Sequence, residues 1–150
     1  FYYHIRGFLW CIFINEFIFE FSLVEGASME PTFNQYGDIG LIDKTVNFFR
    51  LYNSNFITKK LKKDDVVSVV NPFIPNKRLC KRILAVEDEK VILDEEKNNF
   101  IIIPKNHIWI EGDNKENSLD SRMFGPVSKH LVEGRVVSRL WPLDKIKSFI

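Results

Sequence analysis

The chain has 150 residues, which is enough for one domain with a buried core. Its 21 basic and 20 acidic side chains nearly cancel, so the sequence lacks the basic excess of a nucleic-acid-binding protein, and we expect no nucleic-acid partner. Cys11 and Cys80 form no disulfide framework and are expected to be free thiols, and without C-x-x-C or H-E-x-x-H motifs we expect no metal and no cofactor.

The first 24 residues form an aromatic, apolar segment. Its most apolar run covers residues 8–14, and Glu16 and Glu20 interrupt it, whereas a full membrane span needs about 20 mostly apolar residues. Three interpretations are open: a short span over residues 1–15, a helix lying on the bilayer surface, or a buried core helix or strand. Because Arg6 precedes the run and acidic residues follow it, we expect residues 1–24 to be a short membrane-anchoring helix that sends the rest of the chain across the membrane.

After this segment, short apolar runs alternate with turn signals. The β-branched run at residues 66–70, for example, is bounded by Asp64-Asp65 and Asn71-Pro72, which is typical of a strand. The polar connection at residues 43–63 is long for a loop and is expected to be partly helical or functional. The pattern predicts a mainly β domain over residues 25–150, a coiled antiparallel sheet or barrel. Its expected strands cover residues 39–42, 66–70, 78–86, 91–93, 100–103, 108–110 and 134–140.

The first candidate for chemistry is Ser28, in the stretch EGASMEPT. Gly26 permits a tight backbone just before it, and Pro31 pushes Glu30 toward extended geometry. Ser28 is therefore expected at a bend. There it is either a nucleophile or an ordinary turn serine, and these eight residues alone do not separate the two.

Lys81 is the second candidate. It lies in the middle of an expected strand with apolar neighbours, and burial of a lysine favours its neutral form by lowering its pKa. A neutral amine can take the proton from a serine hydroxyl. The alternative is an exposed strand lysine, since Lys77, Arg78 and Arg82 are close in sequence.

The polar loop at residues 112–122 is dense in hydrogen-bonding side chains. A calcium loop is excluded, because Lys115 occupies a ligand position and the loop has no central glycine. Asp120 and Arg122 could form a charge-assisted pair. A catalytic triad of Ser28, His107 and Asp113 is a further alternative.

A series of motifs in a fixed order resembles the type I signal peptidases, and most closely their mitochondrial inner membrane branch. The resemblance extends from residue 26 to residue 143. Its motifs are Gly26-x-Ser28-Met29-x-Pro31-Thr32, Gly37-Asp38, Cys80-Lys81-Arg82, His107-x-Trp109, Gly112-Asp113-Asn114-x-x-Asn117-Ser118-x-Asp120-Ser121-Arg122, Gly125-Pro126, Gly134-Arg135 and Trp141-Pro142-Leu143.

The resemblance implies a membrane-anchored serine endopeptidase with a coiled β catalytic domain. In that family's pattern Ser28 matches the nucleophile, Lys81 the general base and Ser118 the serine that orients the lysine. Asp120 and Arg122 match a structural pair behind the site. The backbone N–H of Ser28 would contribute to the oxyanion hole, and Gly26 implies that no side chain adds a second donor.

The resemblance also implies how substrate and partners bind. The family pairs an extended substrate with its strands, here along residues 21–27 and 78–80, with Gly26, Ala27, Met29 and Cys80 in the substrate-binding region. The implied partners are precursor proteins with cleavable sorting or signal sequences, the lipid bilayer and a second protease subunit in a heterodimer. The implied location is the mitochondrial inner membrane, with the catalytic domain facing the intermembrane space. A bacterial or plastid signal peptidase and a non-catalytic leader-binding subunit remain as alternatives.

The chain departs from the family pattern where the family has glycine. Asp64, Asp88 and Asn106 stand at three of these places, and Ala85 at a fourth. The turns at these positions must form without the conformational freedom of glycine. None of the departures removes a residue matched to catalysis.

Overall fold

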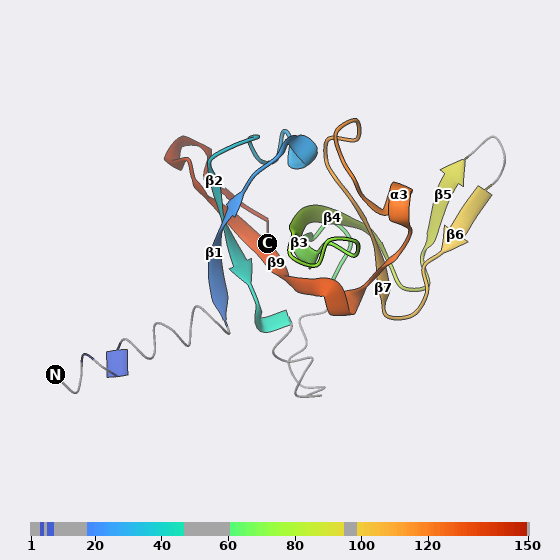
Figure 1. The fold of residues 1–150 in the computed structure, drawn as a ribbon, viewed down its shortest axis with the longest axis horizontal. Coiled ribbons are helices and arrows are strands. Elements are labelled where there is room, and N and C mark those ends of the chain that lie inside the picture. Colours follow the sequence, from blue (N-terminus) through green and yellow to red (C-terminus); the bar gives the residue numbers. More distant parts are fainter. Residues whose placement is uncertain (1–3, 5, 8–17, 47–60, 95–98, 150) are drawn as a thin grey trace.

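The structure is a computed structural model, which describes residues 4, 6–7, 18–46, 61–94 and 99–149. Over these residues the protein is mainly β, as expected (Figure 1). One antiparallel sheet has eight strands in the order β1-β2-β9-β3-β4-β7-β8, with β10 pairing with β9. It curls, so that β1 and β2 lie across from β3 and β4 (Figure 1). A second sheet contains only β5 and β6.

The strands and helical turns have the following bounds. The strands are β1 Phe19–Val24, β2 Asp38–Asp43, β3 Val66–Val70, β4 Arg78–Val86, β5 Lys90–Asp94, β6 Asn99–Ile102, β7 His107–Glu111, β8 Val127–Ser128, β9 Val132–Trp141 and β10 Lys147–Ser148. The short helices are η1 Ala27–Met29, α3 Ser121–Phe124, η2 Lys129–Leu131 and η3 Leu143–Lys145. Every expected strand is present, β3 and β4 with the expected bounds and the others shifted by one or two residues.

β1 lies inside the segment that was expected to be a helix. Phe19 pairs with Asp43 and Val24 with Asp38, so these six residues belong to the sheet and the expected helix cannot include them. Residues 1–3, 5 and 8–17 of the expected anchor lie outside the described residues, as do residues 47–60 of the long connection. Among the residues that the structure describes, no helix is both long enough and apolar enough to cross a membrane.

Both faces of β3 are buried, which explains why its sequence is a β-branched run rather than an alternation. Val67 and Val69 pack into one apolar cluster and Val66 into another. The second cluster also contains Met29 and Phe33 from the loop that follows β1. The core therefore holds the segment around Ser28 against the central strands.

Three of the four substituted glycine positions of the family pattern have left-handed backbones. Asp64, Asp88 and Asn106 have φ angles of 72°, 67° and 61°. Among residues other than glycine, asparagine and aspartate adopt this region most readily, because their short polar side chains can form local hydrogen bonds. The turns keep a positive φ without glycine. Ala85 lies in strand β4 and is buried, so no turn depends on it.

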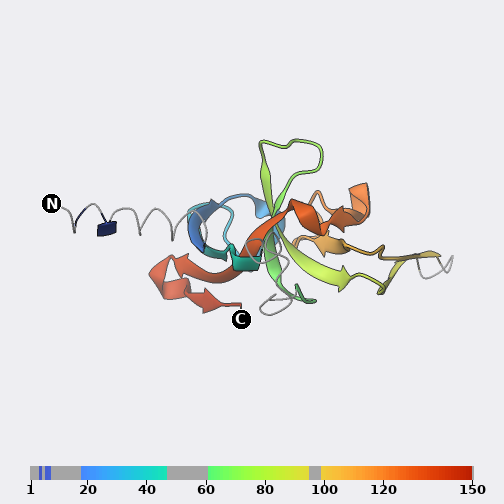
Figure 2. The same ribbon diagram turned by 90° about the horizontal axis from the view of Figure 1, so that it is seen from below.

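The β5–β6 hairpin extends away from the main sheet (Figures 1 and 2). Val91 and Ile101 face the rest of the molecule and pack against a cluster that contains Trp109. Ile92 and Phe100, a cross-strand pair, are exposed on its other side.

Candidate active site

Ser28 is the middle residue of the one-turn helix η1, and this helix begins directly after a glycine whose backbone conformation other residues rarely adopt. Gly26 has a φ of 104°, and its N–H donates to the carbonyl of Gln35 at 2.8 Å. Met29 is buried in the core, which fixes one side of the turn. The carbonyl of Ser28 accepts a hydrogen bond of 3.0 Å from the N–H of Asn114. The bend expected at Ser28 is therefore present and held at both ends.

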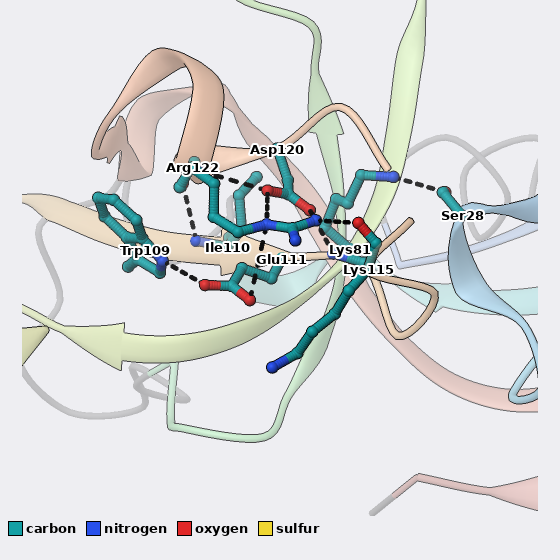
Figure 3. Close-up of polar contacts among 10 residues, drawn as sticks. Ser28, Lys81, Trp109, Ile110, Glu111, Lys115, Asp120 and Arg122 are labelled. Atoms are coloured by element: carbon teal, nitrogen blue, oxygen red, sulfur yellow. Dashed lines mark hydrogen bonds and ion pairs between the residues drawn. The ribbon is translucent and has the colours of Figure 1, made fainter. Parts of the chain in front are cut away.

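Lys81 reaches this turn from the centre of β4. Its side chain points at Ser28, and Nζ lies 2.5 Å from Oγ in hydrogen-bond contact (Figure 3). Only 2% of Lys81 is exposed, and this burial lowers the pKa of its amine, although Asp120 and Asp113 oppose the shift. The structure thus brings together two residues that are 53 positions apart in sequence.

Ser118 lies beside this pair without a hydrogen bond to Lys81. Its Oγ is buried and has no partner in hydrogen-bond geometry among the described residues, although its proximity to Asp120 contributes to the low pKa of that carboxyl. A Cβ added to Gly112 would collide with this hydroxyl and with the Ser28 carbonyl. The site is closely packed around Ser118, and glycine is required at position 112.

Asp120 and Arg122 form the expected pair. Arg122 donates from Nε to Oδ1 and from Nη2 to Oδ2 of Asp120, both at 2.9 Å, and also from Nη2 to the Lys115 carbonyl (Figure 3). Burial alone would raise the pKa of Asp120, but hydrogen bonds from Arg122 and from the Gly112 N–H lower it to about 2. Asp120 is fully buried and caps α3. The pair therefore fixes the polar loop at both ends.

A second charged pair lies on the other side of β4. Arg82 donates to Asp113 through Nε at 2.8 Å and Nη2 at 2.7 Å, and it also contacts Thr32. Asp113 is thus committed to Arg82, and His107 lies at the start of β7, five residues before Gly112, with its ring near the Lys105 carbonyl. Five strand residues span about 15 Å, so the alternative triad is not assembled.

Two strand edges face each other beside the dyad. β1 ends the strand order, and β4 pairs with β7 only from Arg82 onward, so residues 78–81 of β4 have one open edge among the described residues. A pocket of about 260 Å³ lies between these edges, and Cys80 lines it. Burial raises the pKa of the Cys80 thiol to about 12, so the thiol stays protonated. Of the other predicted substrate-binding residues, Gly26, Ala27 and Met29 lie at or beside the Ser28 turn and not in the pocket lining.

Sequence reasoning missed a buried pair that holds the loop after Ser28. Asp38 is fully buried and accepts from the N–H of Asn34 at 2.7 Å and from Arg139 at 3.4 Å. Arg139 also donates to the Thr32 carbonyl at 2.8 Å. The only sequence signals were the Gly-Asp turn and an arginine inside an apolar strand. Neither signal indicates that the two residues, 101 positions apart, are partners.

The curled antiparallel sheet brings a serine hydroxyl against a buried lysine amine. This arrangement is that of a serine peptidase with a lysine base. Comparison with known sequences gives the family. The sequence model described as "Signal peptidase, peptidase S26" matches residues 3–98 and 92–141. The chain belongs to the signal peptidase family, peptidase S26.

The curated relatives include both subunits of a mitochondrial protease. The chain is 36% identical to mitochondrial inner membrane protease subunit 1 of Xenopus tropicalis, over 86% of this chain and 73% of the relative. It is also 36% identical to subunit 2 of Danio rerio, over 79% of this chain and 62% of the relative. Among solved structures it is similar to a signal peptidase I from Enterococcus faecalis V583, with 23% identity and a TM-score of 0.43, over 52% of this chain and 97% of the other.

Proposed function

We propose that this protein is a membrane-anchored serine endopeptidase of the mitochondrial inner membrane. It removes sorting or signal sequences from proteins that are translocated into or across that membrane. The observation that carries the proposal is the contact of 2.5 Å between Nζ of the buried Lys81 and Oγ of Ser28. The family membership and the names of the relatives support the substrate class and the location.

In the proposed mechanism, Ser28 is the nucleophile and neutral Lys81 the general base. Oγ of Ser28 attacks the carbonyl carbon of the scissile peptide bond while its proton passes to Nζ of Lys81. The carbonyl oxygen becomes an oxyanion, which the N–H of Ser28 helps to bind. Collapse of the intermediate breaks the C–N bond, and the Lys81 ammonium returns its proton to the leaving amine. Water then attacks the acyl-enzyme by the same route and restores the Ser28 hydroxyl.

The surroundings of Lys81 support this role for it. Burial lowers the pKa of the amine, so a larger fraction is neutral near physiological pH than for an exposed lysine. We assign Ser118 to orient the amine, because its hydroxyl is buried beside the dyad and no hydrogen bond among the described residues holds it elsewhere. Asp120 and Arg122 support that loop from behind.

The open edges of β1 and β4 are the proposed substrate site. An extended leader placed between them can form backbone hydrogen bonds with both strands, as in other cases of strand addition. Its scissile bond would then lie at the turn formed by Gly26, Ala27 and Ser28. Met29 would support this turn from below, and Cys80 would contact a leader side chain in the pocket.

The first 18 residues are the proposed membrane anchor, since β1 begins at Phe19. The domain from β1 onward would face the intermembrane space. Curated relatives carry the names of subunit 1 and subunit 2, which supports a second subunit of the same family as a partner in a heterodimer.

The test is cleavage of translocated precursors by the purified full chain. Wild type is expected to release one fragment with a defined new N-terminus, as read by mass spectrometry. Ser28→Ala and Lys81→Met are each expected to abolish cleavage, with circular dichroism and melting curves showing a folded protein. An acylating inhibitor should label Ser28 in wild type. Cleavage that persists in Ser28→Ala would overturn the proposal.

A further inference from the structure

Thr32 lies in the loop that leads from η1 to β2, shortly after Ser28. Its carbonyl accepts a hydrogen bond of 2.8 Å from Nη1 of Arg139, and its Oγ1 accepts one of 3.3 Å from Nη2 of Arg82. The first arginine lies on β9 and the second on β4. Thr32 is therefore held at its backbone by one strand and at its hydroxyl by another.

The contact with Arg82 connects Thr32 to the strand of the proposed base. Arg82 directly follows Lys81 on β4, and successive side chains of a strand point to opposite faces. Lys81 contacts Ser28, and Arg82 contacts Thr32. The segment from Ser28 to Thr32 is thus fixed to β4 at two points, one on each face of the strand.

Backbone contacts connect Thr32 to the turn that carries Ser28. The N–H of Phe33, the next residue, donates to the carbonyl of Met29 at 2.9 Å. Phe33 and Met29 are both buried in the same apolar cluster, so they cannot move independently. A displacement of Thr32 would therefore displace the Ser28 turn as well.

The hydroxyl of Thr32 joins an ion pair that does not depend on it. Burial alone would raise the pKa of Asp113, and hydrogen bonds from Arg82 and then from Thr32 lower it. Arg82 has two further hydrogen bonds to Asp113, at 2.8 and 2.7 Å. Loss of the threonine hydroxyl would leave these two bonds in place and would remove only their connection to the Ser28 loop.

We propose that Thr32 is a positioning residue, which sets the position of Oγ of Ser28 against Nζ of Lys81. This inference rests on the proposed function, since it needs Ser28 as the nucleophile and Lys81 as its base. The proton passes only while the two atoms stay in contact, and a misplacement of about 1 Å can lower a rate by about 10²-fold. Thr32 does not line the pocket between β1 and β4, so substrate binding should not depend on it.

The test compares Thr32→Val, which has the shape of threonine without its hydroxyl, with Thr32→Ser, which keeps the hydroxyl. Thr32→Val should lower kcat on a leader peptide, and the rate at which an acylating inhibitor labels Ser28, by about tenfold. KM should not change, nor should Kd for the same peptide on the inactive Ser28→Ala background. The melting temperature should fall by no more than about 2–4 °C, as for one lost hydrogen bond. Thr32→Ser should restore most of both rates.

Thr45→Val is the matched control. The hydroxyl of Thr45 donates to the carboxylate of Asp43, at the end of β2 that lies away from the Ser28 loop. The same substitution there also removes a hydroxyl that is bound to a charged group. It should leave kcat and the labelling rate at their wild-type values.

The inference is overturned if Thr32→Val keeps the wild-type kcat, if Thr32→Ser does not recover it, or if Thr32→Val fails to fold. A loss in Kd with kcat unchanged would also overturn it, because Thr32 would then act in substrate binding. If wild type neither cuts a precursor nor is labelled at Ser28, the proposed function itself fails. If wild type is active and Thr32→Val matches it, the inference alone fails.

Discussion

Arg82 holds Asp113 through two hydrogen bonds of 2.8 and 2.7 Å, although the two residues are 31 positions apart. Arg82 directly follows Lys81 on β4, and Asp113 directly follows Gly112 beside Ser118. This ion pair therefore ties the strand that supplies the proposed base to the loop that packs behind it. Burial alone would raise the pKa of Asp113, but the hydrogen bonds from Arg82 lower it.

We expect Arg82→Lys to lower both stability and kcat. A lysine cannot reproduce the two parallel hydrogen bonds, and hydrogen bonds to charged groups contribute about 1.5–3 kcal/mol each. Arg82→Lys, Asp113→Asn and the double variant are compared by melting and by kcat. The losses of the two single variants should not add up in the double variant, because each single change already breaks the same contact. Simple additivity of the two losses would mean that the pair does not connect the two segments.

The rate of cleavage should rise with pH through the lowered pKa of Lys81. The proposed base acts in its neutral form, which becomes dominant above that pKa, and burial places the pKa below the ordinary lysine value of 10.5. The profile of kcat/KM against pH for wild type should therefore show an ascending limb that ends below 10.5. A profile that is level from neutral to alkaline pH, or that falls, would argue against a lysine base.

Lys81→Met should raise the melting temperature at pH 7. In the native state the pKa of Lys81 is lowered, so the unfolded chain binds more protons between that pKa and 10.5, and stability rises with pH across this window. At a pH below this range, Lys81 is charged in the folded protein, and burying its ammonium group lowers the free energy of unfolding. Methionine has an apolar side chain of similar length and removes this destabilisation. A gain of about 1 kcal/mol corresponds to about 2–4 °C for a chain of this size. A variant that melts below wild type would show that the lysine stabilises the fold.

Asp120→Asn should weaken the protein at neutral pH. The carboxylate has a pKa near 2 in the folded state against an ordinary value of 3.8, so it stabilises the fold above 3.8, and this contribution is lost as pH falls toward 2. The difference corresponds to about 2 kcal/mol. Between pH 2 and 7 the melting temperature of the variant should change less with pH than that of wild type. Asp144→Asn, at an exposed site on η3, serves as the control and should follow wild type.

Ser118→Ala should lower kcat and leave the melting temperature nearly unchanged. The buried hydroxyl has no partner in hydrogen-bond geometry among the described residues, and Asp120 keeps its hydrogen bonds from Arg122 and Gly112 without it, so we expect its removal to cost the fold little. The amine of Lys81, however, would lose the group proposed to orient it, and general-base catalysis contributes roughly 10²–10⁴-fold in rate. KM should change little, because the proposed substrate contacts lie on β1 and β4. If Ser118→Ala instead melts as early as Asp120→Asn, with a proportionate loss of rate, the serine has a structural role.

Local signals predicted most of the strands. β3 was predicted with its bounds because a β-branched run is flanked there by aspartates and by Asn71-Pro72, and β4 because it lies between the loop of Pro72 and Pro75 and the turn at residues 87–90. β1 was not, because its aromatic sequence continues an apolar segment that a helix would also favour. The pairing of β1 with β2, and of β2 with β9, depends on contacts between distant segments that no local pattern contains.

The candidate site was predicted through its motifs rather than through its geometry. Order and spacing selected Ser28 and Lys81, but only the fold brings their side chains to 2.5 Å. The Asp38–Arg139 pair was missed because its members lie 101 positions apart and neither residue type is unusual where it occurs. The role of Ser118 depends on a side-chain rotation, which sequence does not determine.

Within the part of the chain that the structure describes, one edge of β1 has no strand partner, and this edge affects how the isolated protein behaves in solution. A strand with open N–H and C=O groups can pair with the same strand of another molecule, and natural proteins commonly counter this with charged side chains on the edge. Glu20 is the one charged residue on β1, and it is already neutralised by Lys44 and Arg78, while Phe21 and Leu23 remain exposed. The empty protein is therefore prone to edge-to-edge aggregation at high concentration, and a bound leader peptide should keep it monomeric.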